Sequence, residues 1–205
     1  MAGGIFDQEV ISNLQALPRD APRACLAPTD CVEVFWAVTR VLCDAFLSKI
    51  EEQIERADRL IALYPESRLD WQPAMQGAFS GALLLGHLLE CLAGFCAVLQ
   101  AVKPDHLRHF SELRLLPVNH RCGTGEARAR IEAYRARIRE GFALIQDSDL
   151  ARLVPTVFVG SGETLLMLLL GNLEHLVNHK HQLFTYLKLI GVDVGSGDLY
   201  HFRGG

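Results

Sequence analysis

The chain has 205 residues, 50% of them apolar and 21% charged, a composition typical of a globular protein large enough for one sizeable core. Its formal net charge of −4 argues against a general nucleic-acid binder, because such proteins are usually basic. No uninterrupted apolar run reaches the roughly 18 residues that a membrane-spanning helix requires, and the first residues lack the pattern of a secretion signal. We therefore expect neither nucleic acid nor a membrane as a partner.

The cysteines indicate a reducing compartment rather than a disulfide framework. A chain of this length does not need disulfides to stabilise its core, and no C-x-x-C pair occurs. We interpret the cysteines as reduced thiols that serve as small hydrophobic side chains, which favours a cytoplasmic location. The six are Cys25, Cys31, Cys43, Cys91, Cys96 and Cys122.

The N-terminal part divides into an arm and the start of a domain. Residues 1–29 contain three prolines and no regular pattern, so we expect an arm on the surface of one domain that spans residues 30–205. The first predicted helix covers residues 30–63, with Asp30 as N-cap and Glu33 at the position of a capping box. A Tyr-Pro pair ends it.

The second predicted helix covers residues 80–102. Its inner stripe is apolar except for His87, near the middle of the helix. A connection follows over residues 104–123, in which one interpretation is a short helix over residues 105–113.

The third predicted helix covers residues 124–147, with Thr124 as its N-cap. Its arginines alternate with glutamates, so its outer face is more simply interpreted as solvated and ion-paired than as a nucleic-acid surface. Residues 153–159 have a strand-like composition but include Pro155, and we expect an extended loop rather than a sheet.

The fourth predicted helix covers residues 161–191 and is followed by a glycine-rich tail over residues 192–205. Ser161 is its expected N-cap, and Gly191 suits the position after its C-terminus. Four amphipathic helices of this length predict an all-α fold, a four-helix bundle. The inner stripe of the fourth helix consists of Leu168, Asn172, His175, His179, Leu183, Tyr186 and Ile190.

Two histidines interrupt that stripe. His175 and His179 lie four residues apart, so their rings share one face and can converge on one ion. A single core histidine is more often a hydrogen-bonded residue than a ligand, but two unpaired imidazoles on a buried face carry a real cost. His87 can supply a third nitrogen from another helix. His181 lies about 200° from His179 around the helix and is expected to face solvent or a partner.

These three histidines, His87, His175 and His179, are the predicted metal ligands. Three neutral imidazoles and a water suit zinc best, and nickel, iron or manganese are possible. Three protein ligands leave one coordination position open, which favours chemistry over a structural role.

The polar neighbours of the histidines are harder to place. Glu90 lies one turn beyond the histidine of the second helix, whereas Glu174 and Asn178 are turned about 100° from the ligand-bearing face. We interpret all three as ordinary polar groups of the surface or of a helix interface. Asn172 is the better candidate for supporting the site, since it shares the ligand face, and Tyr186 is interpreted as a core aromatic.

Three stretches resemble the DinB/YfiT-like superfamily of metalloenzymes. They are RLIALYPESRLDWQP, GALLLGHLLECLAGF and NLEHLVNHKHQLFTYLKLIGV, the last of which resembles the signature H-x-x-x-H-x-x-Q-L…Y-L-x-x-x-G. The resemblance covers residues 30–205 and implies a four-helix bundle of unusual connectivity, with a metal held by His87, His175 and His179. One departure is Lys180-His181, where the family often has Arg-Gly; it bears on the outer surface or a dimer contact rather than on the ligands.

Three functions follow as hypotheses. The family includes enzymes that use low-molecular-weight thiols, so the first is a metal-dependent thiol S-transferase or isomerase that acts on an electrophilic substrate as a homodimer. The second is a metal-dependent hydrolase, ranked lower because neither Glu90 nor Glu174 is well placed as a general base. The third is a non-enzymatic, stress-related metal-binding protein, because a fold alone does not fix a function.

Overall fold

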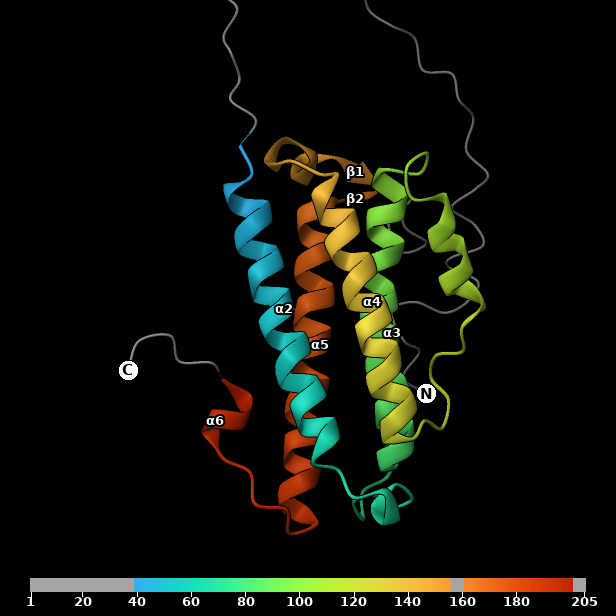
Figure 1. The fold of residues 1–205 in the computed structure, drawn as a ribbon, viewed down its shortest axis with the longest axis vertical. Coiled ribbons are helices and arrows are strands. Elements are labelled where there is room, and N and C mark those ends of the chain that lie inside the picture. Colours follow the sequence, from blue (N-terminus) through green and yellow to red (C-terminus); the bar gives the residue numbers. More distant parts are fainter. Residues whose placement is uncertain (1–38, 156–160, 201–205) are drawn as a thin grey trace, which may run out of the picture.

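The structure, a computed structural model, describes residues 39–155 and 161–200. Four long helices dominate it, so the predicted all-α four-helix bundle is confirmed (Figure 1). The N-terminal arm and the predicted Asp30 cap lie outside the described residues. In chain order the elements, with η for a 3-10 helix, are α2 (Val41–Ala62), η2 (Glu66–Arg68), α3 (Gly81–Val102), η3 (Arg108–Leu115), α4 (Thr124–Ala143), η4 (Asp147–Ala151), β1 (Leu153–Val154), β2 (Glu163–Thr164), α5 (Leu165–Leu189) and α6 (Ser196–Leu199).

The four long helices are not connected as a simple up-and-down bundle. In Figure 1, α2 and α5 run in one direction, and α3 and α4 run in the other. The connection from α3 to α4 therefore returns along the outside of the bundle, through η3. Both α3 and α2 pack against α4 and α5. As a result, the two helices that carry the histidine motifs, α3 and α5, lie side by side and antiparallel.

Helix α2 begins at Val41, so the prediction of one continuous helix from Asp30 is wrong. Thr39 and Arg40 are not helical, and the side chain of Arg40 does not cap the helix. The physical reason is that the exposed N–H groups of the first turn find their acceptor elsewhere in the chain, in η4.

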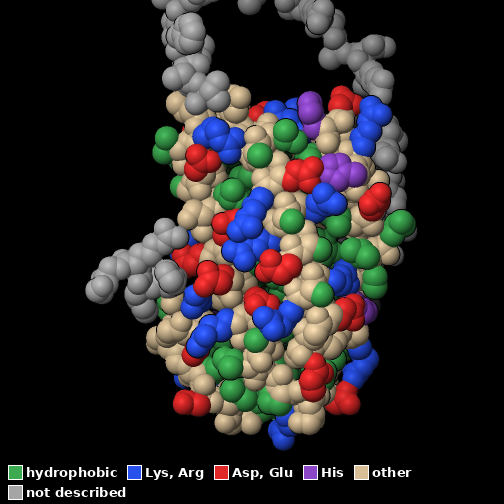
Figure 2. All heavy atoms as spheres, in the orientation of Figure 1, with side chains coloured by type: hydrophobic (Ala, Val, Ile, Leu, Met, Phe, Trp, Pro, Cys, Tyr) green, Lys and Arg blue, Asp and Glu red, His purple; other side chains and the backbone are tan. Residues whose placement is uncertain are grey.

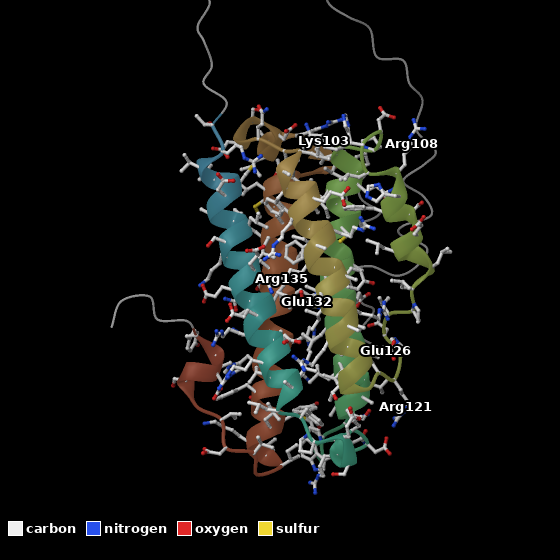
Figure 3. The ribbon with its side chains drawn as sticks, viewed as in Figure 1. Lys103, Arg108, Arg121, Glu126, Glu132 and Arg135 are labelled. Atoms are coloured by element: carbon white, nitrogen blue, oxygen red, sulfur yellow. The ribbon has the colours of Figure 1, made fainter. Side chains whose placement is uncertain are left out.

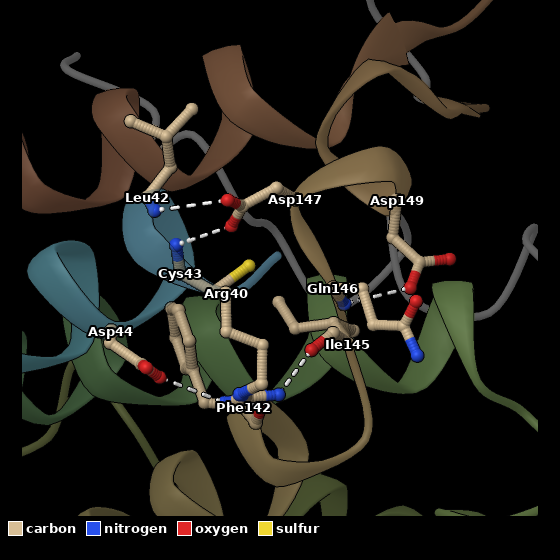
Figure 4. Close-up of polar contacts among 9 residues, drawn as sticks. All are labelled: Arg40, Leu42, Cys43, Asp44, Phe142, Ile145, Gln146, Asp147 and Asp149. Carbon is tan, nitrogen blue, oxygen red and sulfur yellow. Dashed lines mark hydrogen bonds and ion pairs between the residues drawn. The ribbon is translucent and has the colours of Figure 1, made fainter. Parts of the chain in front are cut away.

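That acceptor is Asp147. Its two carboxylate oxygens accept hydrogen bonds from the backbone N–H groups of Leu42 (3.2 Å) and Cys43 (2.9 Å) (Figure 4). Beside it, the Arg40 guanidinium donates to the carbonyl oxygen of Phe142 (3.0 Å), at the end of α4. The start of α2 is therefore fixed by contacts with residues about a hundred positions away, which local sequence does not reveal.

Helix α4 starts at the predicted residue, but its N-cap is not the predicted one. Gly123 is the N-cap, and both the backbone N–H (3.1 Å) and the hydroxyl of Thr124 donate to a carboxylate oxygen of Glu66. The helix ends at Ala143 and not near residue 147 as predicted, because residues from Asp147 onward form the separate 3-10 helix η4.

Helix α5 starts four residues later than predicted. The helix begins at Leu165, and the Thr164 hydroxyl, not Ser161, accepts a hydrogen bond from the Met167 N–H (3.3 Å). The residues before it, Glu163–Thr164, pair antiparallel with Leu153–Val154 as β2 and β1. The expectation of no sheet is thus wrong at residues 153–154. At the other end Gly191 has a φ of 85°, which suits its predicted place after the helix.

Two further segments differ from prediction. The short helix of the α3–α4 connection is a 3-10 helix over Arg108–Leu115, a few residues later than expected. The glycine-rich tail contains α6, which packs against α2. The ammonium group of Lys180 on α5 helps to fasten this helix, because it donates to the carbonyl oxygen of Leu199 (2.9 Å) and to the side-chain oxygen of Gln53 (2.6 Å).

The most buried helix is α3. It begins one residue after the predicted start, and Ser80 caps it by accepting a hydrogen bond from the Leu83 N–H (3.4 Å). By length and composition α3 is apolar enough to cross a membrane, but 83% of its most apolar window is buried inside the bundle. The core helix of a folded domain meets the same criterion, so we assign α3 to the core.

The outer face of α4 is ion-paired, as predicted. Figure 2 shows basic and acidic side chains interspersed over the face formed by α2 and α4. Two of the pairs join the helices: Arg128 to Asp58 (2.8 Å) and Arg139 to Glu51. Arg135 lies 3.5 Å from Glu132 within α4, on the side visible in Figure 3.

Candidate metal centre

Three histidine rings meet between α3 and α5. His87 projects from α3, and His175 and His179 project from successive turns of α5. The Nε2 atoms of His87 and His175 are 3.2 Å apart, and one ligand nitrogen from each of the three rings lies within 4.8 Å of the others. The ring centroids are separated by 4.3–5.0 Å. The structure thus brings together the three residues that the sequence singled out.

The spacing of these nitrogens fits a small divalent cation. Zinc binds imidazole nitrogen at about 2.0–2.1 Å, so two nitrogens of a tetrahedral site are about 3.3 Å apart. The 3.2 Å between the Nε2 atoms of His87 and His175 is close to that value. A direct N–H···N hydrogen bond has a similar length, so the distance alone does not distinguish the two, and the contacts of the other ring nitrogens decide.

The Nδ1 atom of His87 has one hydrogen-bond acceptor, Asn119, and a carboxylate within ion-pair distance, Glu90, whose oxygens have no hydrogen-bond partner in the described residues. The side-chain oxygen of Asn119 lies 2.5 Å from Nδ1, and a carboxylate oxygen of Glu90 lies 3.0 Å from it. Because the Asn119 oxygen accepts and the neighbouring carboxylate is negative, Nδ1 carries the proton and Nε2 presents its lone pair to the other histidines. His87 is therefore fixed in the tautomer that a metal ligand needs.

His179 is held in the same way by its own helix. Its Nδ1 lies 2.9 Å from the side-chain oxygen of Gln182, whose amide group donates in turn to the hydroxyl of Tyr186 (3.2 Å). That hydroxyl donates to the backbone carbonyl oxygen of Phe79 (3.1 Å). This chain of hydrogen bonds leaves the Nε2 lone pair of His179 free as well.

The two fixed rings make a cation the natural occupant. Lone pairs of His87 and His179 point toward one region, and His175 adds a nitrogen there. Lone pairs that converge repel one another unless a cation or a proton lies between them. The Nδ1 atom of His175 is buried and has no hydrogen-bond partner within the described ranges. The donor set therefore fits a divalent metal ion of the zinc class.

The electrostatics keep two rings neutral. Burial lowers the pKa of His179 to about 4, and burial together with the neighbouring His87 lowers the pKa of His175. Burial also opposes the charged form of His87, but the contact with the Glu90 carboxylate and the hydrogen bond with Asn119 outweigh it and raise the pKa of His87. The two neutral imidazoles are in the form that binds metal without first losing a proton.

Glu90 differs most from its sequence-based interpretation. Of the two places expected for it, surface or helix interface, burial excludes the surface: only 1% of Glu90 is exposed, and its carboxylate contacts His87. Its charge also acts on His175 and His179, whose pKa values it raises against the effect of burial. Glu174, by contrast, is exposed, as expected for a residue turned away from the site.

Asn119 was missed by the sequence analysis. It lies in the α3–α4 connection, 32 residues from His87, and has a φ of 56°, a left-handed conformation that asparagine tolerates better than most residues. Its backbone N–H donates to the carbonyl oxygen of Gly86 (3.2 Å). A side chain at Gly86 would overlap the carbonyl oxygen of His120, so this glycine permits the close approach of the loop.

Tyr186 and Asn172, both on the inner stripe of α5, agree with their predictions only in part. Tyr186 is buried, as a core aromatic should be, but its hydroxyl also belongs to the hydrogen-bond chain behind His179. Asn172 is 2% exposed, and neither its amide nitrogen nor its oxygen has a partner in the described part of the chain. His181 is exposed and packs near Phe184, which agrees with its exclusion from the site.

Comparisons with known proteins bear on the fold. No family model matches the sequence, and no curated protein matches it. The structure is similar to the crystal structure of a DinB-like protein, YjoA, from Bacillus subtilis, with a TM-score of 0.56 and 17% sequence identity over 73% of this chain and 93% of that chain. The chain has a DinB-like fold.

The DinB-like fold agrees with the resemblance noted in the sequence. At 17% identity the likeness to YjoA carries the arrangement of the helices and nothing about activity. Only this chain's own histidines indicate a metal site. Taken together, the chain is a DinB-like bundle with a three-histidine group that could hold a metal ion.

Proposed function

We propose that this protein is a metal-dependent enzyme, most concretely an S-transferase or isomerase that uses a low-molecular-weight thiol. One observation carries the proposal: three imidazoles converge, and the Nδ1 contacts of His87 and His179 direct their Nε2 atoms inward. A structural zinc site usually has four protein ligands, whereas three leave a position for a substrate. His87, His175 and His179 would hold the ion, with zinc first and nickel, iron or manganese as alternatives.

A metal bound there would supply a Lewis-acidic position that lowers the pKa of a thiol. The residues of the chain orient the site: Glu90 and Asn119 hold His87, and Gln182 holds His179. In the transfer itself, the thiol sulfur forms a bond to an electrophilic carbon, the leaving group departs with its electron pair, and the thiol proton goes to solvent. Phe79, whose ring centroid is 5.0 Å from that of His87, gives the site an apolar wall.

A hydrolase is the second candidate. It would use a general base beside the metal-facing nitrogens. Glu90 is the carboxylate nearest to the site within the described residues, but its oxygen contacts Nδ1 of His87, on the other side of the ring from Nε2. Glu90 is therefore better suited to orienting His87 than to activating water, which ranks hydrolysis below thiol transfer. A non-enzymatic, stress-related metal-binding role would use the same ligands without a substrate.

Metal content tests the ligand assignment. We expect the full-length protein to carry one metal ion at this centre, and His87→Ala, His175→Ala or His179→Ala to lose it, as measured by elemental analysis of the purified chain. His181→Ala is the matched control from the same helix and should retain the ion. Equal metal loss in all four variants would reject the assignment.

A cobalt titration tests the reaction class. Low-molecular-weight thiols added to the cobalt-loaded protein should produce a sulfur-to-cobalt charge-transfer band. The band is compared before and after thiol addition, in Cys91→Ser and in Cys122→Ser, to separate added thiol from the chain's own sulfur. If no thiol changes the spectrum while esters or amides are hydrolysed, the hydrolase replaces the transferase; binding of metal with neither result favours the storage role.

We further propose a cytoplasmic homodimer. The four cysteines in the described part of the chain are free thiols, which supports a reducing compartment. On α5, Met167 (53% exposed), Leu170 (40%) and Val177 (36%) form an outward apolar stripe at helical spacing. A second copy of this chain is the proposed partner for that stripe, and sedimentation of the wild type against Leu170→Glu tests it: a shift from dimer to monomer is expected.

A further inference from the structure

A second group of metal-ligating side chains lies at the start of α4. His120, Cys122 and Glu126 bring an imidazole nitrogen, a thiol sulfur and a carboxylate oxygen within 4.8 Å of one another. We propose that these three residues form a second metal site, which takes a zinc-class divalent ion through one nitrogen, one sulfur and one oxygen. It shares no ligand with the three-histidine centre and does not depend on the function proposed for that centre.

The backbone holds the three side chains in place. The Cys122 N–H donates to the carbonyl oxygen of Ala82 on α3 (3.0 Å), so the cysteine is fixed against the core and is 1% exposed. Glu126 lies in the first turn of α4, at the end of the bundle where Figure 3 labels it. The Nε2 atom of His120 is 2.8 Å from its carboxylate. The site is thus built from a segment anchored on one helix and the first turn of another.

One ring nitrogen of His120 is left without a hydrogen-bond partner within residues 39–155 and 161–200. Its Nδ1 atom is buried and has no hydrogen-bond partner in the described residues. A His–Glu ion pair at a helix N-terminus is ordinary by itself, but here a buried thiol lies within ligand distance of it, and the other nitrogen of the same imidazole is buried and unsatisfied. An ion would use the sulfur as a thiolate: the S–H bond breaks, a sulfur–metal bond forms, and the proton goes to solvent.

The local charge favours a cation. Glu66 accepts hydrogen bonds from Thr124, and a carboxylate oxygen of Glu66 would lie 3.8 Å from a Cβ placed on Gly123, inside the same segment. Arg130 is the opposing charge, 3.6 Å from Glu126. Arg130 is also bound to the carbonyl oxygen of Pro117 (2.5 Å), and Arg121, between two of the proposed ligands, is paired with Asp70. Both arginines thus have partners outside the three proposed ligands. Nitrogen, sulfur and oxygen ligands in one site suit zinc better than magnesium or calcium.

The proposed site lies on the segment that also positions His87. Asn119, the residue before His120, binds Nδ1 of His87. The carbonyl oxygen of His120 packs against Gly86 on α3, one residue before that ligand. An ion held by His120 and Cys122 would therefore stiffen the loop that orients the first centre.

Cobalt titration of the metal-free, full-length chain tests the second site. Wild type should bind two equivalents and show a sulfur-to-cobalt charge-transfer band without added thiol. The double variant His175→Ala, His179→Ala should bind one equivalent and keep that band. Cys122→Ser should bind one equivalent and lose the band. Glu126→Gln, a change at a half-exposed side chain that leaves the core intact, should also lose the second equivalent.

Cys91→Ser is the matched control. Cys91 is buried on α3, and its sulfur donates to the backbone carbonyl oxygen of His87 (3.7 Å), so both equivalents and the band should persist in this variant. A wild type that binds one equivalent, lost in the double histidine variant and unaffected by Cys122→Ser, overturns the second site. The reverse pattern, one equivalent lost only in Cys122→Ser, supports the second site and overturns the first.

Discussion

At the scale of single residues, the candidate centre is defined as much by the partners of the histidines as by the histidines themselves. His87 and His179 each give up one nitrogen to an acceptor, which fixes the tautomer and directs the other nitrogen inward. Such partners commonly change metal affinity by about 10- to 100-fold when removed. Glu90 is the partner with the largest expected effect, because it is charged, almost wholly buried and in contact with His87, and its charge also acts on the other two rings.

We therefore predict that Glu90→Gln weakens metal binding at the three-histidine centre by about tenfold or more. Glutamine keeps an acceptor for the Nδ1–H of His87 but removes the negative charge that offsets the metal's positive charge. The measurement is competition with a chelator of known affinity, in the Cys122→Ser background so that one centre is observed. Glu174→Gln, on the exposed side of α5, is the matched control and should bind metal as tightly as its parent. Unchanged affinity in Glu90→Gln would assign the orientation of His87 to Asn119 alone.

At the scale of elements, the helix ends divide into those with local caps and those with distant ones. Ser80 caps α3 from the adjacent position, and the start of this helix was predicted to within one residue. Asp147 serves α2 and Glu66 serves α4 from remote parts of the chain, and the predicted starts or caps of both helices were wrong. Helical periodicity is a local signal and predicted the existence of all four helices. A cap delivered by tertiary contact leaves no local signal, so it required the structure.

Removing the distant cap should loosen the start of α2. We predict that Asp147→Ala lowers the melting temperature, because the N–H groups of Leu42 and Cys43 lose their acceptor. Burial opposes ionisation of Asp147, but those hydrogen bonds outweigh it and lower its pKa below the usual value of 3.8. A carboxylate with a lowered pKa stabilises the fold above its unfolded-state pKa, and this contribution is lost as the pH falls through the folded-state pKa.

The difference in melting temperature between wild type and Asp147→Ala should therefore be full at neutral pH and shrink below about pH 3.8. Thermal melts followed by circular dichroism over a pH series measure it. Ser148→Ala, at the exposed neighbouring position, should match wild type throughout. A difference that stays constant down to low pH would mean that the carboxylate charge plays no part.

At the scale of the whole molecule, the connection between α3 and α4 completes the three-histidine centre. It allows α3 and α5 to lie antiparallel, so that His87 meets the two histidines of α5, and it carries Asn119 back to the same place (Figure 1). The sequence predicted that the three histidines would meet, because two of them follow the helical repeat on one face of a helix. It did not predict Asn119, since nothing near residue 119 indicates which helix the loop will cross. The bundle core, in contrast, is apolar along all four helices and does not depend on the site.

That separation of core and centre predicts how the protein responds to a chelator. An ion that binds only the folded chain stabilises it by about 2.7 kcal/mol when its free concentration is a hundred times its dissociation constant. A chelator should therefore lower the melting temperature, while the buried apolar core keeps the metal-free chain helical and cooperatively folded. Calorimetry and far-ultraviolet circular dichroism on Cys122→Ser, with and without chelator, isolate the three-histidine centre. The same variant carrying His175→Ala should show no response. Complete loss of helix on chelation would instead identify the metal as structural and contradict a catalytic role.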